Sequence, residues 1–160
     1  MSTPKLIAQK LTAAKQTLSV AESCTGGLIS STLTDIPGSS VFFHGSVIAY
    51  DNAVKTSLVR VPAALIKKHG AVSAPVAKAM AQNIRKTIKT DYGIGVTGIA
   101  GPTGGTKAKP VGLIFIAASS SRKTIVKRFI FKGTRLTIKR QAAKTALTLL
   151  LELIEEKKKR

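Results

Sequence analysis

Hydrophobic residues along the chain follow a helical period in some stretches and an extended pattern in others. Val76, Met80 and Ile84, for example, recur at the spacing of one face of an amphipathic helix. Short apolar runs bounded by turn residues predict strands between the helical stretches. We expect helices at residues 6–14, 26–34, 52–58, 62–69, 73–88 and 134–156, and strands at 18–22, 41–50, 92–97, 111–118 and 125–131.

The order of these elements predicts a single α/β domain. Helices alternate with strands in the first part, whereas a short polar turn joins the last two strands and indicates a hairpin. A hairpin makes the sheet mixed rather than purely parallel. The chain has 160 residues, which suits one full hydrophobic core, and no repeat or interdomain linker divides it. We therefore expect one domain over residues 1–160, with a basic tail at 157–160.

The lack of targeting signals in the sequence and its single cysteine favour a protein of the cytoplasm. No apolar run reaches the roughly 18 residues that a membrane-spanning helix needs, and the first ten residues are not followed by the apolar block of a secretory signal. A single cysteine, Cys24, excludes an internal disulfide. We expect a cytoplasmic protein that does not associate with membranes.

The net charge is unusually high, with 26 Lys and Arg residues against seven Asp and Glu, a formal charge of +19. Such a field attracts polyanions whatever the fold. Proteins that read nucleic acids usually add aromatic platforms or a motif, and this chain has five Phe, two Tyr, no Trp and no such motif. A solvated basic surface and nonspecific attraction of polyanions both remain open interpretations.

The scarcity of acids and histidines excludes other chemistries. No acid lies between residues 92 and 151, so a hydrolase built on two carboxylates has few residues to draw on. His44, His69 and Cys24 do not have the spacing of metal ligands, so no metal site is expected.

Residues 21–27, Ala-Glu-Ser-Cys-Thr-Gly-Gly, carry the strongest local signal. A short strand precedes them and a helix follows, which predicts a tight turn. The turn would place the Ser23 and Thr25 hydroxyls beside free N–H groups at a helix start, where negative charge is stabilised. A hydroxyl nucleophile with an adjacent anion hole would use this arrangement, and so would an ordinary N-cap.

Two more strand ends carry polar residues and glycine, at 50–55 and 97–105. Ligands of open α/β sheets bind outside such ends. Lys55 can act as a base where burial lowers its pKa, or can be a surface lysine. Tyr50 alone suits a packing role at the strand end. The glycine-rich stretch could wrap a phosphate with N–H groups or form a flexible connection.

Six ordered motifs resemble the CinA C-terminal domain family, whose members include nicotinamide-mononucleotide amidohydrolases. They are Ala-Glu-Ser-Cys-Thr-Gly-Gly at 21–27, Pro-Gly-Ser-Ser at 37–40, Tyr-Asp-Asn-Ala-Val-Lys at 50–55, His-Gly-Ala-Val-Ser at 69–73, Val-Thr-Gly-Ile-Ala-Gly-Pro-Thr-Gly-Gly-Thr at 96–106 and Lys-Pro-Val-Gly at 109–112. The resemblance implies a three-layer α/β/α domain that forms a homo-oligomer. It also implies deamidation of a pyridine mononucleotide, nicotinamide mononucleotide, to nicotinate mononucleotide and ammonia, with no cofactor.

The same resemblance assigns site residues. It implies a catalytic Ser23–Lys55 pair assisted by Tyr50. From the turn itself we expect backbone N–H groups around residues 25–27 to stabilise the oxyanion. The substrate-binding positions expected are Thr25, Gly26, Gly27, Ser40, Thr97, Gly98, Gly101, Gly104, Gly105 and Arg135.

Three positions depart from the family pattern. Asp51 stands in place of serine, Thr134 in place of aspartate and Lys139 in place of arginine. Asp51 would raise the pKa of a nearby lysine, and Lys139 cannot form the bidentate contact of an arginine. Two alternatives therefore stay open: a noncatalytic, polyanion-binding member of the fold, and a Ser–Lys amidase acting on another small carboxamide.

Overall fold

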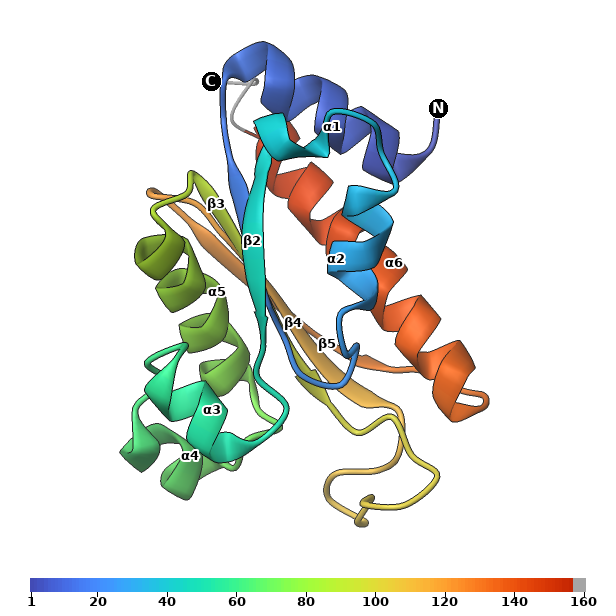
Figure 1. Ribbon diagram of the computed structural model, residues 1–160. Coiled ribbons are helices and arrows are strands. Elements are labelled where there is room, and N and C mark those ends of the chain that lie inside the picture. The colour runs from blue at the N-terminus through green and yellow to red at the C-terminus, as the bar shows by residue number, and fades with distance from the viewer. Residues whose placement is uncertain (157–160) are drawn as a thin grey trace.

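The computed structural model, described here for residues 1–156, is a five-stranded mixed sheet between two layers of helices (Figure 1). Helix α5 packs on one face with α4 against it, and α1, α2 and α6 cover the other face. The expected three-layer α/β/α fold is confirmed. The elements are α1 Thr3–Ala14, β1 Leu18–Glu22, α2 Leu28–Thr34, the 3₁₀ turn η1 Ser39–Val41, β2 Phe43–Ile48, α3 Asn52–Ser57, α4 Ala63–His69, α5 Ala74–Ile88, β3 Tyr92–Gly98, β4 Leu113–Ser119, β5 Thr124–Ile130 and α6 Arg135–Glu156.

The strands follow the order β2-β1-β3-β4-β5 across the sheet. Strands β2, β1 and β3 are parallel, whereas β4 runs antiparallel to β3 and forms the expected hairpin with β5. The carboxyl ends of the three parallel strands therefore lie together at one edge of the sheet. The loops that leave this edge begin at residues 23, 49 and 99, and they carry most of the predicted site.

The core has one part on each face of the sheet. Strand β1 is buried at all five positions because helices cover it from both sides. On the α5 side the core includes Val76, Met80 and Ile84, the residues whose spacing predicts the helix. On the other side α6 contributes more residues than any other element, including Leu150.

Helix α5 lies unusually close to β3 because two strand residues have no side chain. A Cβ atom at Gly95 would lie 2.5 Å from the carbonyl oxygen of Ala77. A Cβ atom at Gly93 would overlap the carbonyl oxygen of Ala81. These glycines let the helix backbone rest on the strand, which fixes where the start of α5 meets the sheet edge.

Several element boundaries differ from the sequence predictions by one to three residues, among them the start of α1 at Thr3 rather than 6. Helix α2 begins at Leu28 rather than 26, because Gly26 and Gly27 have φ angles of +60° and +96°. The strand predicted at 41–50 is shorter, since η1 takes its first residue. Ser73 is the N-cap residue of α5, but its hydroxyl donates to the Gly70 carbonyl instead of accepting from a helix N–H. The tail at 157–160 lies outside the described residues.

Candidate active site

The loops that follow β1, β2 and β3 surround a hollow of about 200 Å³. Six predicted site residues line it: Ser23, Tyr50, Lys55, Thr97, Gly98 and Arg135. They come from four separate parts of the chain, and the parallel arrangement of the strands brings three of those parts to one edge. The fourth part is the first residue of α6.

The turn that carries Ser23 is held by the carboxylate of Glu22, which is completely buried. One carboxylate oxygen accepts from the N–H groups of Gly27 and Ile29, at 3.0 and 3.1 Å. The other accepts from the N–H and the hydroxyl of Ser30, at 2.9 and 2.6 Å. A negative charge at the start of α2 also interacts favourably with the helix dipole. Glu22 thus connects the end of β1 to α2 and fixes the intervening turn.

This arrangement corrects part of the predicted oxyanion hole. The Gly27 N–H donates to Glu22, and the Gly26 N–H donates to the Ser23 carbonyl at 3.0 Å. Both groups are therefore unavailable to a ligand. The Thr25 side chain is buried, and within residues 1–156 its hydroxyl has no hydrogen-bond partner. Residues 25–27 support the turn beneath Ser23 and do not line the hollow.

Lys55 is buried, with 2% of its surface exposed, so the surface-lysine interpretation is wrong. It lies in the short helix α3, whose start is capped by Asp51 accepting from the Ala53 N–H at 2.7 Å. Its ammonium donates to the Tyr50 carbonyl at 3.1 Å. Burial lowers the pKa of Lys55 below its ordinary value of 10.5, and the Asp51 carboxylate opposes this shift, as expected from the sequence.

Cys24 adjoins Ser23 and also lines the hollow, but its environment keeps it protonated. Burial raises the pKa of the Cys24 thiol to about 12. Only the thiolate is a good nucleophile, so Cys24 is inert at neutral pH. Ser23 is 7% exposed and presents the hydroxyl of the turn to the hollow.

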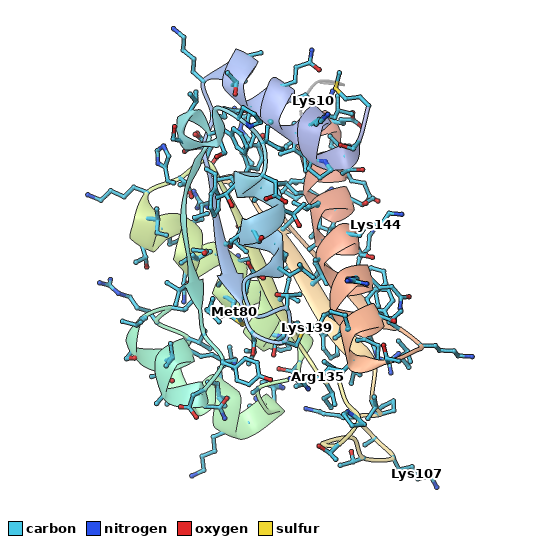
Figure 2. The ribbon with its side chains drawn as sticks, turned by 45° about the vertical axis from the view of Figure 1, so that its right-hand side comes forward. Lys10, Met80, Lys107, Arg135, Lys139 and Lys144 are labelled. Atoms are coloured by element: carbon cyan, nitrogen blue, oxygen red, sulfur yellow. The ribbon has the colours of Figure 1, made fainter. Side chains whose placement is uncertain are left out.

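Arg135 closes one side of the hollow by joining two loops. Its guanidinium donates to the Gly101 carbonyl and to the Tyr50 hydroxyl, each at 2.6 Å. The Tyr50 hydroxyl therefore contacts Arg135, while the Tyr50 carbonyl contacts Lys55. Lys139 lies one turn further along α6, and its ammonium would be 3.4 Å from a Cβ atom placed at Gly26 (Figure 2). This edge of the hollow is strongly positive.

Three other predicted binding residues lie away from the hollow. Ser40 belongs to η1, which precedes β2, and so sits at the amino ends of the parallel strands, at the opposite edge of the sheet. Gly104 and Gly105 are exposed in the loop after β3 and do not line the hollow. None of the three contacts the hollow within one chain, because parallel pairing places Ser40 at the other end of the strands and Gly104 and Gly105 lie in an exposed loop outside its lining.

The remaining predicted positions have structural duties as well. Thr97 lines the hollow, and its hydroxyl donates to the Ala71 carbonyl at 2.9 Å. A Cβ atom at Gly98 would lie 2.7 Å from the Leu113 carbonyl oxygen, so close packing on β4 explains this glycine. Gly101 holds Arg135 through its carbonyl.

Sequence reasoning missed Asn52, Ala71, Val72 and Ala100 as lining residues. Asn52 lies within the Tyr-Asp-Asn-Ala-Val-Lys motif at 50–55, so its place between Tyr50 and Lys55 could have predicted it as a lining residue. Ala71 and Val72 precede α5 and carry no chemistry of their own. Only the close packing of α5 on β3 reveals that they reach the site.

Fold and site together define an α/β/α domain with a hydroxyl and a buried lysine at the carboxyl ends of its parallel strands. The model of the CinA C-terminal domain family matches residues 1–154. The chain belongs to the CinA C-terminal domain family.

Relatives and solved structures agree with this assignment. A CinA-like protein of Syntrophus aciditrophicus is 48% identical over 145 residues, which is 90% of this chain and 34% of that protein. The chain spans about a third of the length of the curated relatives it matches. The competence/damage inducible protein CihA of Agrobacterium tumefaciens superposes with a TM-score of 0.93 at 33% identity, covering 94% of this chain and 93% of that one. A CinA superfamily protein of Escherichia coli gives 0.91 at 28%, with coverages of 94% and 88%.

Within residues 1–156, no helix is both long and apolar enough to cross a bilayer. The same residues contain no group of three His, Cys, Asp or Glu side chains placed to hold a metal ion.

The lowered pKa of Lys55 predicts a pH-dependent contribution to stability. Folding disfavours the charged form, so the folded protein loses this proton at a lower pH than the unfolded chain does. As pH rises from the folded pKa toward 10.5, wild type should therefore gain stability relative to Lys55→Met. Urea unfolding of both proteins across this range measures the difference. Lys144→Met, which removes an exposed ammonium on α6, controls for net charge. If the difference in unfolding free energy between wild type and Lys55→Met stays constant with pH, the prediction is wrong.

Proposed function

We propose that this chain is an amidohydrolase of cytoplasmic pyridine-nucleotide salvage, which converts nicotinamide mononucleotide to nicotinate mononucleotide and ammonia. The observation that carries the proposal is a buried lysine of lowered pKa lining the same hollow as a serine hydroxyl. A lysine of this kind is a known activator of hydroxyl nucleophiles, and it needs no metal or organic cofactor.

In the proposed reaction the Ser23 hydroxyl oxygen attacks the carboxamide carbon while Lys55, in its neutral form, takes the hydroxyl proton. The tetrahedral intermediate then collapses and its C–N bond breaks. The Lys55 ammonium returns a proton to the departing nitrogen, which leaves as ammonia. Water hydrolyses the resulting Ser23 ester, which releases the carboxylate and restores the serine.

The oxyanion of this intermediate needs donors other than the two engaged glycine N–H groups. Thr25 is completely buried and does not line the hollow, so its N–H is not such a donor either. Tyr50 acts by positioning, because its carbonyl holds Lys55 and its hydroxyl holds Arg135.

The positive edge of the hollow suits the substrate phosphate. Arg135 uses one terminal nitrogen on Gly101 and the other on Tyr50, and each nitrogen retains another N–H. Lys139 supplies a second cation beside the turn. A phosphate held here would favour a nucleotide over the free amide as substrate.

Asp51 modifies this mechanism without abolishing it. Its carboxylate raises the pKa of Lys55, but burial is the larger effect and the net shift is downward. The same carboxylate caps α3 and so helps hold the lysine in place. The aspartate at position 51, which departs from the family pattern, therefore also stabilises the start of the helix that carries Lys55.

Ammonia release from purified protein tests the proposed substrate. Nicotinamide mononucleotide should be hydrolysed much faster than nicotinamide or glutamine, because only the nucleotide offers both the aromatic amide and the phosphate. Equal rates with all three would point to an amidase of another small carboxamide. No release from any amide, together with nucleic-acid binding that survives high salt, would favour the noncatalytic polyanion-binding alternative.

Substitutions of Lys55 separate a base from a positive charge. Arginine keeps the charge but does not become neutral near physiological pH, and methionine keeps the apolar stem alone. Both Lys55→Arg and Lys55→Met should lower turnover by at least about 100-fold while the protein stays folded. Steady-state kinetics with circular dichroism as a folding check measures this. If Lys55 only attracted phosphate, Lys55→Arg would retain most activity and Lys55→Met would mainly raise KM.

A further inference from the structure

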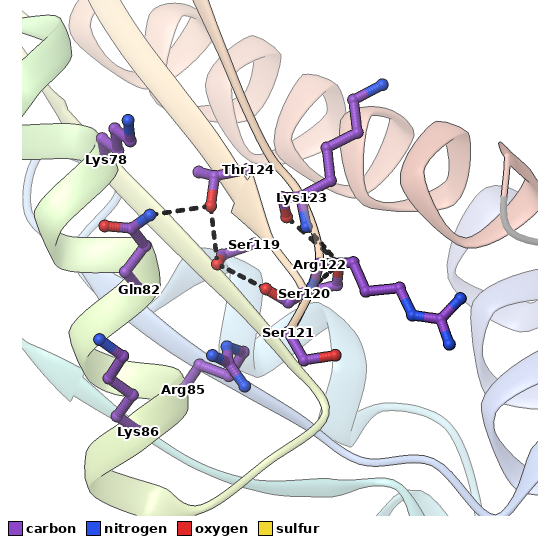
Figure 3. A pocket seen from close by; sticks show the side chains of 10 residues that line it. All are labelled: Lys78, Gln82, Arg85, Lys86, Ser119, Ser120, Ser121, Arg122, Lys123 and Thr124. Atoms are coloured by element: carbon purple, nitrogen blue, oxygen red, sulfur yellow. Dashed lines mark hydrogen bonds between the residues drawn. The ribbon is translucent and has the colours of Figure 1, made fainter.

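A second hollow, of about 280 Å³, lies between α5 and the turn joining β4 to β5 (Figure 3). Lys78, Gln82, Arg85 and Lys86 line it from α5. Residues 119–124 line it from the opposite side. Ser119 pairs with Gly93 at the amino end of β3, so this hollow lies at the opposite edge of the sheet from Ser23 and Lys55.

The hollow is lined by cations and hydroxyls and contains no acidic side chain. Its five basic residues are Lys78, Arg85, Lys86, Arg122 and Lys123. Lys123 forms an ion pair with Glu156 at 2.6 Å. The other four form no ion pair with any residue between 1 and 156. Four uncompensated cations around one small space create a strongly positive local potential.

Arg85 carries the most informative atom of this hollow. Its stem lies against β3, where a Cβ atom at Gly93 would be 2.8 Å from the Arg85 Cβ. Its Nε is buried and has no hydrogen-bond partner among the described residues. A buried donor left unpaired is costly, so the Arg85 guanidinium has unused hydrogen-bonding capacity beside the hollow.

The opposite wall is held rigid by its own hydrogen bonds. The Ser120 hydroxyl accepts from the N–H groups of Arg122 and Lys123, at 3.3 and 3.1 Å. Thr124 receives a hydrogen bond from the Gln82 amide at 3.1 Å and shares one with Ser119 at 3.0 Å (Figure 3). The contact between Gln82 and Thr124 joins the two walls, so the basic residues surround a preformed space.

We propose that this hollow binds a compact phosphate anion, a phosphoryl or diphosphoryl group of a small molecule. Guanidinium and ammonium groups with neighbouring hydroxyls are the donors that recognise such oxygens. The small volume and the absence of any lining aromatic residue favour a compact anion over a nucleic-acid strand. The site does not depend on the proposed amidohydrolase activity.

Calorimetric titration of the full chain with inorganic pyrophosphate at low ionic strength tests the proposal. Arg85→Met keeps the apolar stem over Gly93 and removes the guanidinium, and Arg122→Gln changes an exposed residue. Each should weaken pyrophosphate binding by about tenfold or more. Arg128→Met, an equal loss of charge at an exposed position of β5 outside the hollow, should change it by less than about threefold. Thermal unfolding checks that Arg85→Met remains folded.

A further variant separates this hollow from the candidate active site. Pyrophosphate binding that depends on Arg85 and Arg122 should persist in Arg135→Met, which removes the cation between Tyr50 and Gly101. Binding lost in Arg135→Met but kept in Arg85→Met would place the anion in the other hollow and overturn the proposal. Equal weakening by Arg85→Met and Arg128→Met would also overturn it, since net charge alone would then explain binding. So would a mixed-sequence single-stranded oligonucleotide that displaces pyrophosphate and binds more tightly through Arg85.

Discussion

The geometry of the candidate site depends on one buried carboxylate. It belongs to Glu22, the last residue of β1, and it reaches the start of α2. It accepts four hydrogen bonds, one from the N–H of Gly27 just before α2, two from N–H groups within α2 and one from the Ser30 hydroxyl. Hydrogen bonds to a charged group each contribute about 1.5–3 kcal/mol. This interaction occupies the helix N-terminus that would otherwise attract an anion, so it makes the turn a rigid support for Ser23 instead of a phosphate cradle.

The second constraint is the burial of Lys55 and the neighbouring Cys24, which shifts the pKa of both side chains. A buried ammonium is costly, and within residues 1–156 Lys55 donates to a single carbonyl, that of Tyr50. Burial lowers its pKa and so makes the neutral amine accessible. The Cys24 pKa moves up through the same burial, which removes the thiol from competition. The same burial therefore favours the neutral amine of Lys55 and the protonated thiol of Cys24, as the proposed mechanism requires.

Sequence pattern predicted the elements and the mixed sheet because the hydrophobic period of each segment agrees with its burial, as at Val76, Met80 and Ile84. The motifs also identified the three loops that meet at the strand ends. The sequence pattern could not show that the Glu22 carboxylate accepts from the Gly27 N–H, which was expected to bind the oxyanion. That contact depends on how a buried side chain is oriented toward the following helix. It also misplaced Ser40, since sequence proximity to a motif does not reveal which end of a parallel strand a residue occupies.

The central claim is that the Ser23 hydroxyl, and not the neighbouring thiol, attacks the amide. The most direct measurement is ammonia release from nicotinamide mononucleotide by Ser23→Ala and by Cys24→Ala, with folding checked for both. Both changes remove one polar atom from adjacent, nearly buried residues, so they form a matched pair. The account predicts that Ser23→Ala lowers turnover by at least about 100-fold and that Cys24→Ala has a much smaller effect. Near-normal turnover by Ser23→Ala, or a greater loss in Cys24→Ala, would contradict it.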